Sequence, residues 1–132
     1  MLTVYYDGKC GLCRREIEHY QRLVTQRSIA GFDWVDVASS PARAAEINVS
    51  HVEALRALHV QTSTGDVVSG ADAFIVIWKQ LPGVWSVLGR FTALPGIYFL
   101  ASHIYHVFAA WRFSRLEHCQ LALKTERQQQ VT

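Results

Sequence analysis

The chain is poor in cysteine and in net charge. It has three cysteines in 132 residues, too few for a disulfide framework, so a reducing compartment is the natural expectation. The formal net charge is only +2, which is too small to indicate nucleic acid or an anionic surface as the partner. Any partner must therefore be recognised through a local site.

The N-terminal segment lacks the features of a secretory leader. It has no basic residue before the acidic Asp7, whereas a signal peptide begins with a positively charged region. We therefore expect a cytoplasmic protein whose thiols stay reduced.

The apolar content is sufficient for one folded domain. Hydrophobic residues make up 50% of the chain and charged residues 18%, a composition that fits a globular protein and excludes a disordered one. We expect residues 1–132 to form a single domain, with a helical extension at 84–123 and a flexible tail at 124–132.

The N-terminal part predicts a strand, a helix and a second strand. Residues 2–6 form a short apolar run, typical of a central strand, and residues 32–37 alternate as a second strand does. Because such crossovers are right-handed, the two strands should be parallel neighbours. Apolar side chains between them recur at helical spacing: Cys13, Ile17, Tyr20 and Val24.

The middle of the chain predicts short helices and a hairpin. Ser40 and Ser50 each occupy a helix N-cap position, which indicates two short helices. Residues 58–62 and 67–69 flank a turn-forming segment and read as an antiparallel hairpin. A helix over 71–81 follows.

A strongly apolar and aromatic stretch runs from 84 to 113. We expect a short helix after Val84 and then a long helix from Pro95 to about Leu123, beyond the end of this stretch. Its 91–113 part approaches the length of about 20 apolar residues that a membrane span needs. Pro95 interrupts it, however, and His103 and His106 would be costly within a bilayer. We expect a buried or peripheral-membrane helix rather than a span, with a homodimer or membrane contact if aromatic side chains gather on one face.

The most informative motif is Cys10-Gly-Leu-Cys13, placed where a strand leads into a helix. A first helical turn brings residues three apart onto one side, close enough for two sulfurs to form a disulfide. Cys10 lies at the positive end of the helix dipole and beside Lys9, and both favour a thiolate. We therefore expect Cys10 to be the nucleophile and Cys13, less exposed, to resolve the mixed disulfide.

Asp7 lies three positions before Cys10. Its carboxylate could accept a proton from Cys13, directly or through water, or it could cap the loop or the helix N-terminus. The two roles are compatible. Gly8 and Gly11 would give the turn its freedom and let a substrate backbone approach.

Zinc is the alternative reading of a Cys-x-x-Cys motif. A structural zinc site normally needs four ligands, so the pair would have to recruit Cys119 or the histidines, of which His103 and His106 are closely spaced. Because no second paired motif exists in the sequence, we expect redox chemistry and no metal. Cys119 alone is most simply a small apolar core residue.

The segment from Tyr5 to Cys13 resembles the DCC family, a group of predicted thiol-disulfide oxidoreductases named for an Asp-Cys-Cys signature. The segments Leu58–Val60, Ser69–Ala73 and Tyr105–Phe113, which includes Arg112, also resemble that family's pattern. The resemblance implies an α/β fold, namely a thioredoxin-like βαβ-(α)-ββα unit with additional C-terminal helices.

The resemblance also implies a dithiol activity with Asp7, Cys10 and Cys13 as signature residues. The positions expected to bind substrate are those around the dithiol and at the start of later elements: Lys9, Gly11, Leu12, Leu58, Gly70 and Asp72. The substrate would be a disulfide-containing protein or a small thiol compound, with no cofactor other than glutathione as a reductant. Arg56-Ala57-Leu58 lacks the cis-proline that thioredoxins carry before the third strand, which favours a narrower substrate or a glutathione-dependent cycle.

Two other functions remain open from the sequence. A glutathione-binding, transferase-like protein would hold the glutathione carboxylate at the helix N-terminus near Gly70 and Asp72. A non-catalytic membrane-associated or interaction module would use the apolar C-terminal helices instead.

Overall fold

The computed structural model describes residues 2–81 and 83–131, with side chains through Gln129. Its centre is a four-stranded sheet in the order β2-β1-β3-β4. The strands are β1 (Leu2–Tyr6), β2 (Phe32–Asp36), β3 (His59–Gln61) and β4 (Val67–Ser69). β1 pairs in parallel with β2, while β3 is antiparallel to both β1 and β4. The parallel βαβ unit and the hairpin expected from the sequence are confirmed.

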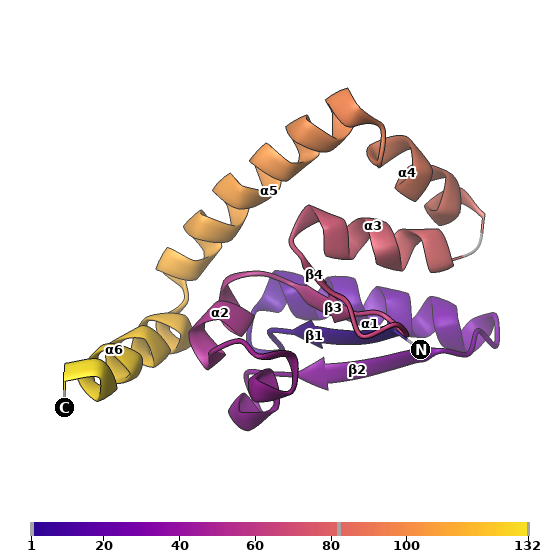
Figure 1. Cartoon of the computed structure of the whole chain (residues 1–132). Helices are drawn as coiled ribbons and strands as arrows, with labels where there is room; N and C mark the ends of the chain where they lie inside the picture. The colour runs from indigo at the N-terminus through magenta and orange to yellow at the C-terminus, as the bar shows by residue number, and fades with distance from the viewer. Residues whose placement is uncertain (1, 82, 132) are drawn as a thin grey trace.

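The helices cover both faces of this sheet (Figure 1). In chain order they are α1 (Gly11–Gln26), the 3₁₀ helix η1 (Pro41–Ile47), α2 (His51–Arg56), α3 (Ala71–Gln80), α4 (Val84–Thr92), α5 (Pro95–Arg115) and α6 (Glu117–Val131). The arrangement agrees with the expected α/β fold, a thioredoxin-like unit followed by C-terminal helices.

Side chains along β1 point alternately to the two faces of the sheet, so the hydrophobic core forms two clusters, one on each face. Val4 points to the face covered by α1 and α3, where it packs with Ile17, Tyr20 and Ile77. Tyr5 points to the opposite face, where η1 and α2 bury their apolar residues. A strand with apolar side chains on both faces is what a central position requires.

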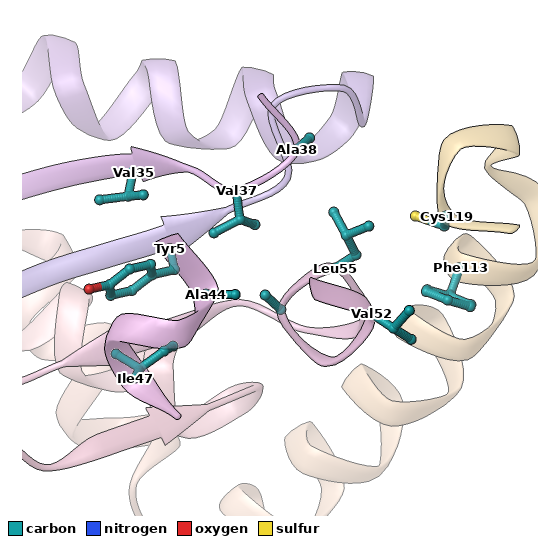
Figure 2. Close-up of a cluster of buried hydrophobic side chains, with 11 residues drawn as sticks. Tyr5, Val35, Val37, Ala38, Ala44, Ile47, Val52, Leu55, Phe113 and Cys119 are labelled. Carbon is teal, nitrogen blue, oxygen red and sulfur yellow. The ribbon is translucent and has the colours of Figure 1, made fainter. Parts of the chain in front are cut away.

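The C-terminal helices complete the second cluster. Figure 2 shows Phe113 of α5 and Cys119 of α6 facing Val52 and Leu55 of α2. Cys119 is fully buried there. Helices α5 and α6 therefore contribute to the same hydrophobic cluster as strands β1 and β2.

Two expectations about the C-terminal part need correction. The single helix expected from Pro95 to about Leu123 is broken at Leu116, which has extended backbone angles, so that α6 can turn back against α2. The 124–132 segment, expected as a flexible tail, is helical through Val131. Apolar residues early in α6, Ala122 and Leu123, pack against the core and support this continuation.

Among the described residues, no single helix is both long and apolar enough to cross a bilayer. The helices α4 and α5 meet that standard only when taken together, across a bend of 95°.

Candidate active site

The loop between β1 and α1 is fixed by two carboxylates. Asp7 accepts a hydrogen bond from the Lys9 backbone N–H (3.0 Å), and Asp36, at the end of β2, accepts one from the Gly8 N–H (2.9 Å). A Cβ on Gly8 would lie only 2.0 Å from Asp36 Oδ2, so a larger residue does not fit. Gly8 is thus needed for close packing against the Asp36 side chain, and Asp7 caps the loop as anticipated.

This loop places Cys10 at the N-cap of α1. Its Sγ accepts a hydrogen bond from the backbone N–H of Cys13 at 3.4 Å, so the two side chains share the first helical turn. Both are free thiols. The spacing expected to bring the pair together is therefore realised in the structure.

The exposure of the two cysteines is the reverse of the expectation. Cys10 is only 3% exposed, whereas Cys13 is partly exposed. The N-cap side chain folds back over the helix end, and Arg112 and Cys119 of the C-terminal helices lie close enough to interact electrostatically with Cys10. Sequence periodicity around α1 could not reveal these neighbours, which lie about a hundred positions later in the chain.

Cys13 has the environment of a protonated thiol. Partial burial, together with the nearby Cys10 and Asp7, raises the pKa of Cys13 to about 12, although the Arg112 guanidinium acts in the opposite direction. At neutral pH the Cys13 side chain is a thiol and needs a base before it can attack a disulfide.

Asp7 forms a buried ion pair with Arg112. Arg112 Nη1 lies 3.1 Å from Asp7 Oδ2, and both side chains are almost completely buried. The guanidinium also donates to the carbonyl oxygen of Leu55. This pair connects the end of β1 to the last turn of α5, and it provides the positive charge that a buried carboxylate needs.

His118 and Cys119 complete the surroundings of Asp7. His118 Nε2 lies 2.8 Å from Asp7 Oδ2, and Cys119 Sγ lies 3.6 Å from both of those atoms. His118 was not among the expected site residues, and Cys119 was expected to be an apolar core residue. No local pattern marks these contacts, because 111 positions separate His118 from Asp7.

Asp7, His118 and Cys119 also offer three potential metal ligands within 4.8 Å of one another. The cation of Arg112, paired to the same carboxylate, would repel a metal ion at this point. His103 and His106, the histidines considered from the sequence, are instead exposed on α5.

A small cavity lies between Cys13 and the Asp7 carboxylate. Asp7, Cys13, Leu58, Tyr105 and Arg112 are among its lining residues, and its volume is about 40 Å³. That space accommodates water-sized molecules but not glutathione. Cys13 and Asp7 therefore face a common space in which a bound water could connect them.

The residues expected to bind substrate fall into two groups. Lys9, Gly11 and Leu12 are exposed around the start of α1, and a Cβ on Gly11 would meet nothing within 4 Å. Leu58 is buried in the cavity wall, and its backbone N–H donates to the Tyr105 hydroxyl at 2.9 Å. Lys9, Gly11 and Leu12 therefore lie on the solvent side of the dithiol motif. Leu58 lies on the side that faces the protein interior.

Gly70 and Asp72 lie outside the cavity that holds Cys13. Gly70 is packed so closely against Tyr105 that an added Cβ would be 3.3 Å from the ring, and Asp72 accepts a hydrogen bond from Tyr98 at 3.0 Å. Helix α5 thus contacts the start of α3, where a glutathione carboxylate was anticipated, and the Asp72 carboxylate would repel it.

The titration of Cys119 gives a testable pH dependence. Burial and the adjacent Asp7 raise the pKa of Cys119 to about 12, above the value near 8.5 of an unfolded cysteine. Between these values the unfolded chain has lost a proton that the folded chain retains, so stability falls as pH rises. We expect the urea midpoint of the Cys119→Ala variant to fall less steeply than that of the wild type from about pH 9 to 11. Equal slopes for the two proteins would contradict this assignment.

Comparison with known proteins identifies a family. No curated protein and no solved structure matches the chain. The family model described as DCC1-like thiol-disulfide oxidoreductase matches residues 4–117, a range that includes Asp7, both cysteines of the motif and Arg112. The chain belongs to the DCC1-like thiol-disulfide oxidoreductase family, and it is an enzyme of that class.

Proposed function

We propose that Cys10 and Cys13 form the redox pair of this oxidoreductase, with Cys10 as the nucleophile and Cys13 as the resolving residue. The observation that carries this assignment is their asymmetry. Cys10 Sγ accepts a backbone N–H at the positive end of α1, while partial burial and the nearby Asp7 keep Cys13 protonated. Negative charge is therefore better accommodated on Cys10 than on Cys13.

The first step is thiolate attack on a substrate disulfide. A bond forms between Cys10 Sγ and one substrate sulfur as the substrate S–S bond breaks, and the other substrate sulfur leaves as a thiolate. In the second step Cys13 loses its proton and attacks Cys10 Sγ, which releases the second substrate thiol and leaves a Cys10–Cys13 disulfide. The substrate has gained two electrons and the enzyme has lost them.

Asp7 is the base that we assign to the second step. It faces the same water-sized cavity as Cys13, so the Cys13 proton can reach the carboxylate through one water. Arg112 holds Asp7 in place and balances its charge. His118 contacts the same carboxylate and is itself partly exposed, which supports a route for the proton from Asp7 to solvent.

The oxidised pair then needs two electrons from an external thiol. We propose glutathione as that reductant, acting in a reducing, cytoplasmic compartment, and a disulfide-containing protein or small thiol compound as substrate. Because the cavity has a volume of about 40 Å³, glutathione would approach from the exposed side of Lys9, Gly11 and Leu12 rather than occupy the interior.

Trapping of the mixed disulfide tests the assignment. In the Cys13→Ser variant the resolving thiol is missing, so reaction with a model disulfide such as oxidised glutathione should leave one glutathionyl group in a mixed disulfide with Cys10 and release the other half as glutathione. Mass spectrometry of the intact protein, followed by peptide mapping, identifies the modified cysteine. Stable attachment at Cys119, or the absence of any adduct, would contradict the proposed roles.

A further inference from the structure

Helix α4 presents an apolar stripe to solvent. Val84, Val87, Leu88 and Phe91 follow one another at intervals of three, one and three positions, which places them on one side of a helix. All four side chains are exposed, Val84 to 79%. A helix packed only within this fold would turn such a stripe inward, so the outer side of α4 lacks a partner in the monomer.

Helix α5 carries a second exposed apolar stripe. Leu100, Ile104, Val107 and Trp111 recur at spacings of four, three and four and are all more than half exposed. With the α4 stripe they make up what we call the α4–α5 apolar face. Exposed apolar stripes of this kind mark an interaction site in a folded protein.

The two helices converge at a corner far from the sheet (Figure 1). They meet at an angle of 95° across a short connection, and the apolar residues nearest this corner, Phe91, Leu94 and Phe99, are exposed to 56%, 51% and 71%. The corner therefore exposes large apolar side chains away from the sheet, where they can insert into an apolar medium such as the interior of a lipid bilayer.

Charge in the chain segment that forms this face has a single sign, although Asp72 at the start of α3 contacts Tyr98 of α5. Between Asp72 and Glu117 the sequence has no acidic residue but four basic ones. Arg112 is buried against Asp7, whereas Lys79, Arg90 and Arg115 are exposed. The net charge of +2 for the whole chain hides this local excess, because the acidic residues all lie elsewhere. Such a segment is complementary to an anionic surface.

A lipid bilayer explains these features better than a second copy of the chain. A two-fold dimer would place the same face on both partners, so that the basic Arg90 and Arg115 would be brought toward their own copies. Trp111, with the Arg115 guanidinium 5.2 Å from its ring centre, combines an aromatic ring with a cation, as residues at a membrane–water interface do. Apolar insertion and attraction to anionic headgroups act together in interfacial helices.

We propose that the α4–α5 apolar face docks peripherally on an anionic lipid bilayer, with the corner around Phe91, Leu94 and Phe99 inserted among the lipids. The inference is independent of the roles assigned to Cys10 and Cys13, since it rests on helices that lie outside the dithiol motif.

Vesicle flotation with the full chain tests this proposal. We expect binding to vesicles of mixed phosphatidylcholine and phosphatidylglycerol, and little binding to phosphatidylcholine alone. Binding should weaken in about 1 M salt, where the Debye length is about 3 Å. Phe99→Glu should lower the partition coefficient about ten-fold or more, because a carboxylate at the inserted corner opposes both lipid burial and the anionic surface.

Leu121→Glu is the matched control. Leu121 is an exposed apolar side chain of α6, 55% accessible, and it lies outside the α4–α5 apolar face, so this variant should bind vesicles as the wild type does. Circular dichroism verifies that both variants remain folded. Equal binding by wild type and Phe99→Glu, or no binding to anionic vesicles, would overturn the proposal. So would a lipid-free dimer, seen by sedimentation, that Phe99→Glu dissociates while vesicles have no effect.

Discussion

Replacement of Cys10 by serine should reduce disulfide turnover by about three orders of magnitude or more. The serine hydroxyl still fits at the N-cap, where serine is a favourable residue, so the variant should fold with α1 intact. It cannot form a disulfide, however, and no thiolate remains at the position that accepts the Cys13 N–H. The measurement is reduction of a small disulfide coupled to glutathione, with thermal unfolding as the check on folding.

The Cys13→Ser variant separates the two thiols in the same assay. It should lose sustained turnover yet still react once with substrate, because Cys10 remains as the attacking group. If Cys10→Ser kept the ability to form a mixed disulfide while Cys13→Ser lost it, the roles would be reversed. This comparison is decisive because two properties disagree about the nucleophile. Solvent access favours Cys13, which is partly exposed while Cys10 is buried, whereas the backbone hydrogen bond at the helix N-terminus favours Cys10.

Removal of the Arg112 guanidinium should be the most destabilising change outside the core. Arg112→Met keeps much of the side chain's volume but leaves Asp7 buried without its positive partner. Breaking one partner of a buried pair typically costs about 3–5 kcal/mol, and the Leu55 carbonyl oxygen also loses its donor. Urea unfolding monitored by tryptophan fluorescence would measure the loss.

Two further variants isolate the charge as the cause. Arg115→Met removes an exposed arginine one turn away on α5 and should change stability by no more than about 0.5 kcal/mol. The double variant Asp7→Asn with Arg112→Met no longer has an uncompensated carboxylate, so it should be more stable than Arg112→Met alone. A loss in Arg112→Met no larger than in Arg115→Met would show that the pair has no structural role.

Local patterns were sufficient to predict most of the fold. The run at 2–6, the helical spacing from Cys13 to Val24 and the turn before Val67 each depend on neighbours a few positions apart, and all three elements appear in the structure. The parallel pairing of β1 and β2 followed from the handedness of the crossover rather than from any particular residue. The break at Leu116 was missed because no glycine or proline marks it.

Only those residues of the candidate site that are close together in the sequence could be predicted. Asp7, Cys10 and Cys13 are close in sequence, and their spacing indicated a dithiol beside a carboxylate. Arg112 entered only through the family resemblance and His118 not at all, because their contacts with Asp7 span 105 and 111 positions. The burial of Cys10 was unexpected for the same reason.

The Asp7–Arg112 pair has a consequence for a chain that emerges from the ribosome N-terminus first. The dithiol segment is synthesised before the arginine that neutralises Asp7, which is added only after β1, α1 and the hairpin are complete. Domains fold as their sequences become available, so an unfinished chain would carry reactive thiols on a sheet that cannot yet bury its carboxylate. Until α5 has been synthesised, the nascent protein contains the Cys10–Cys13 motif but lacks the Arg112 partner of Asp7.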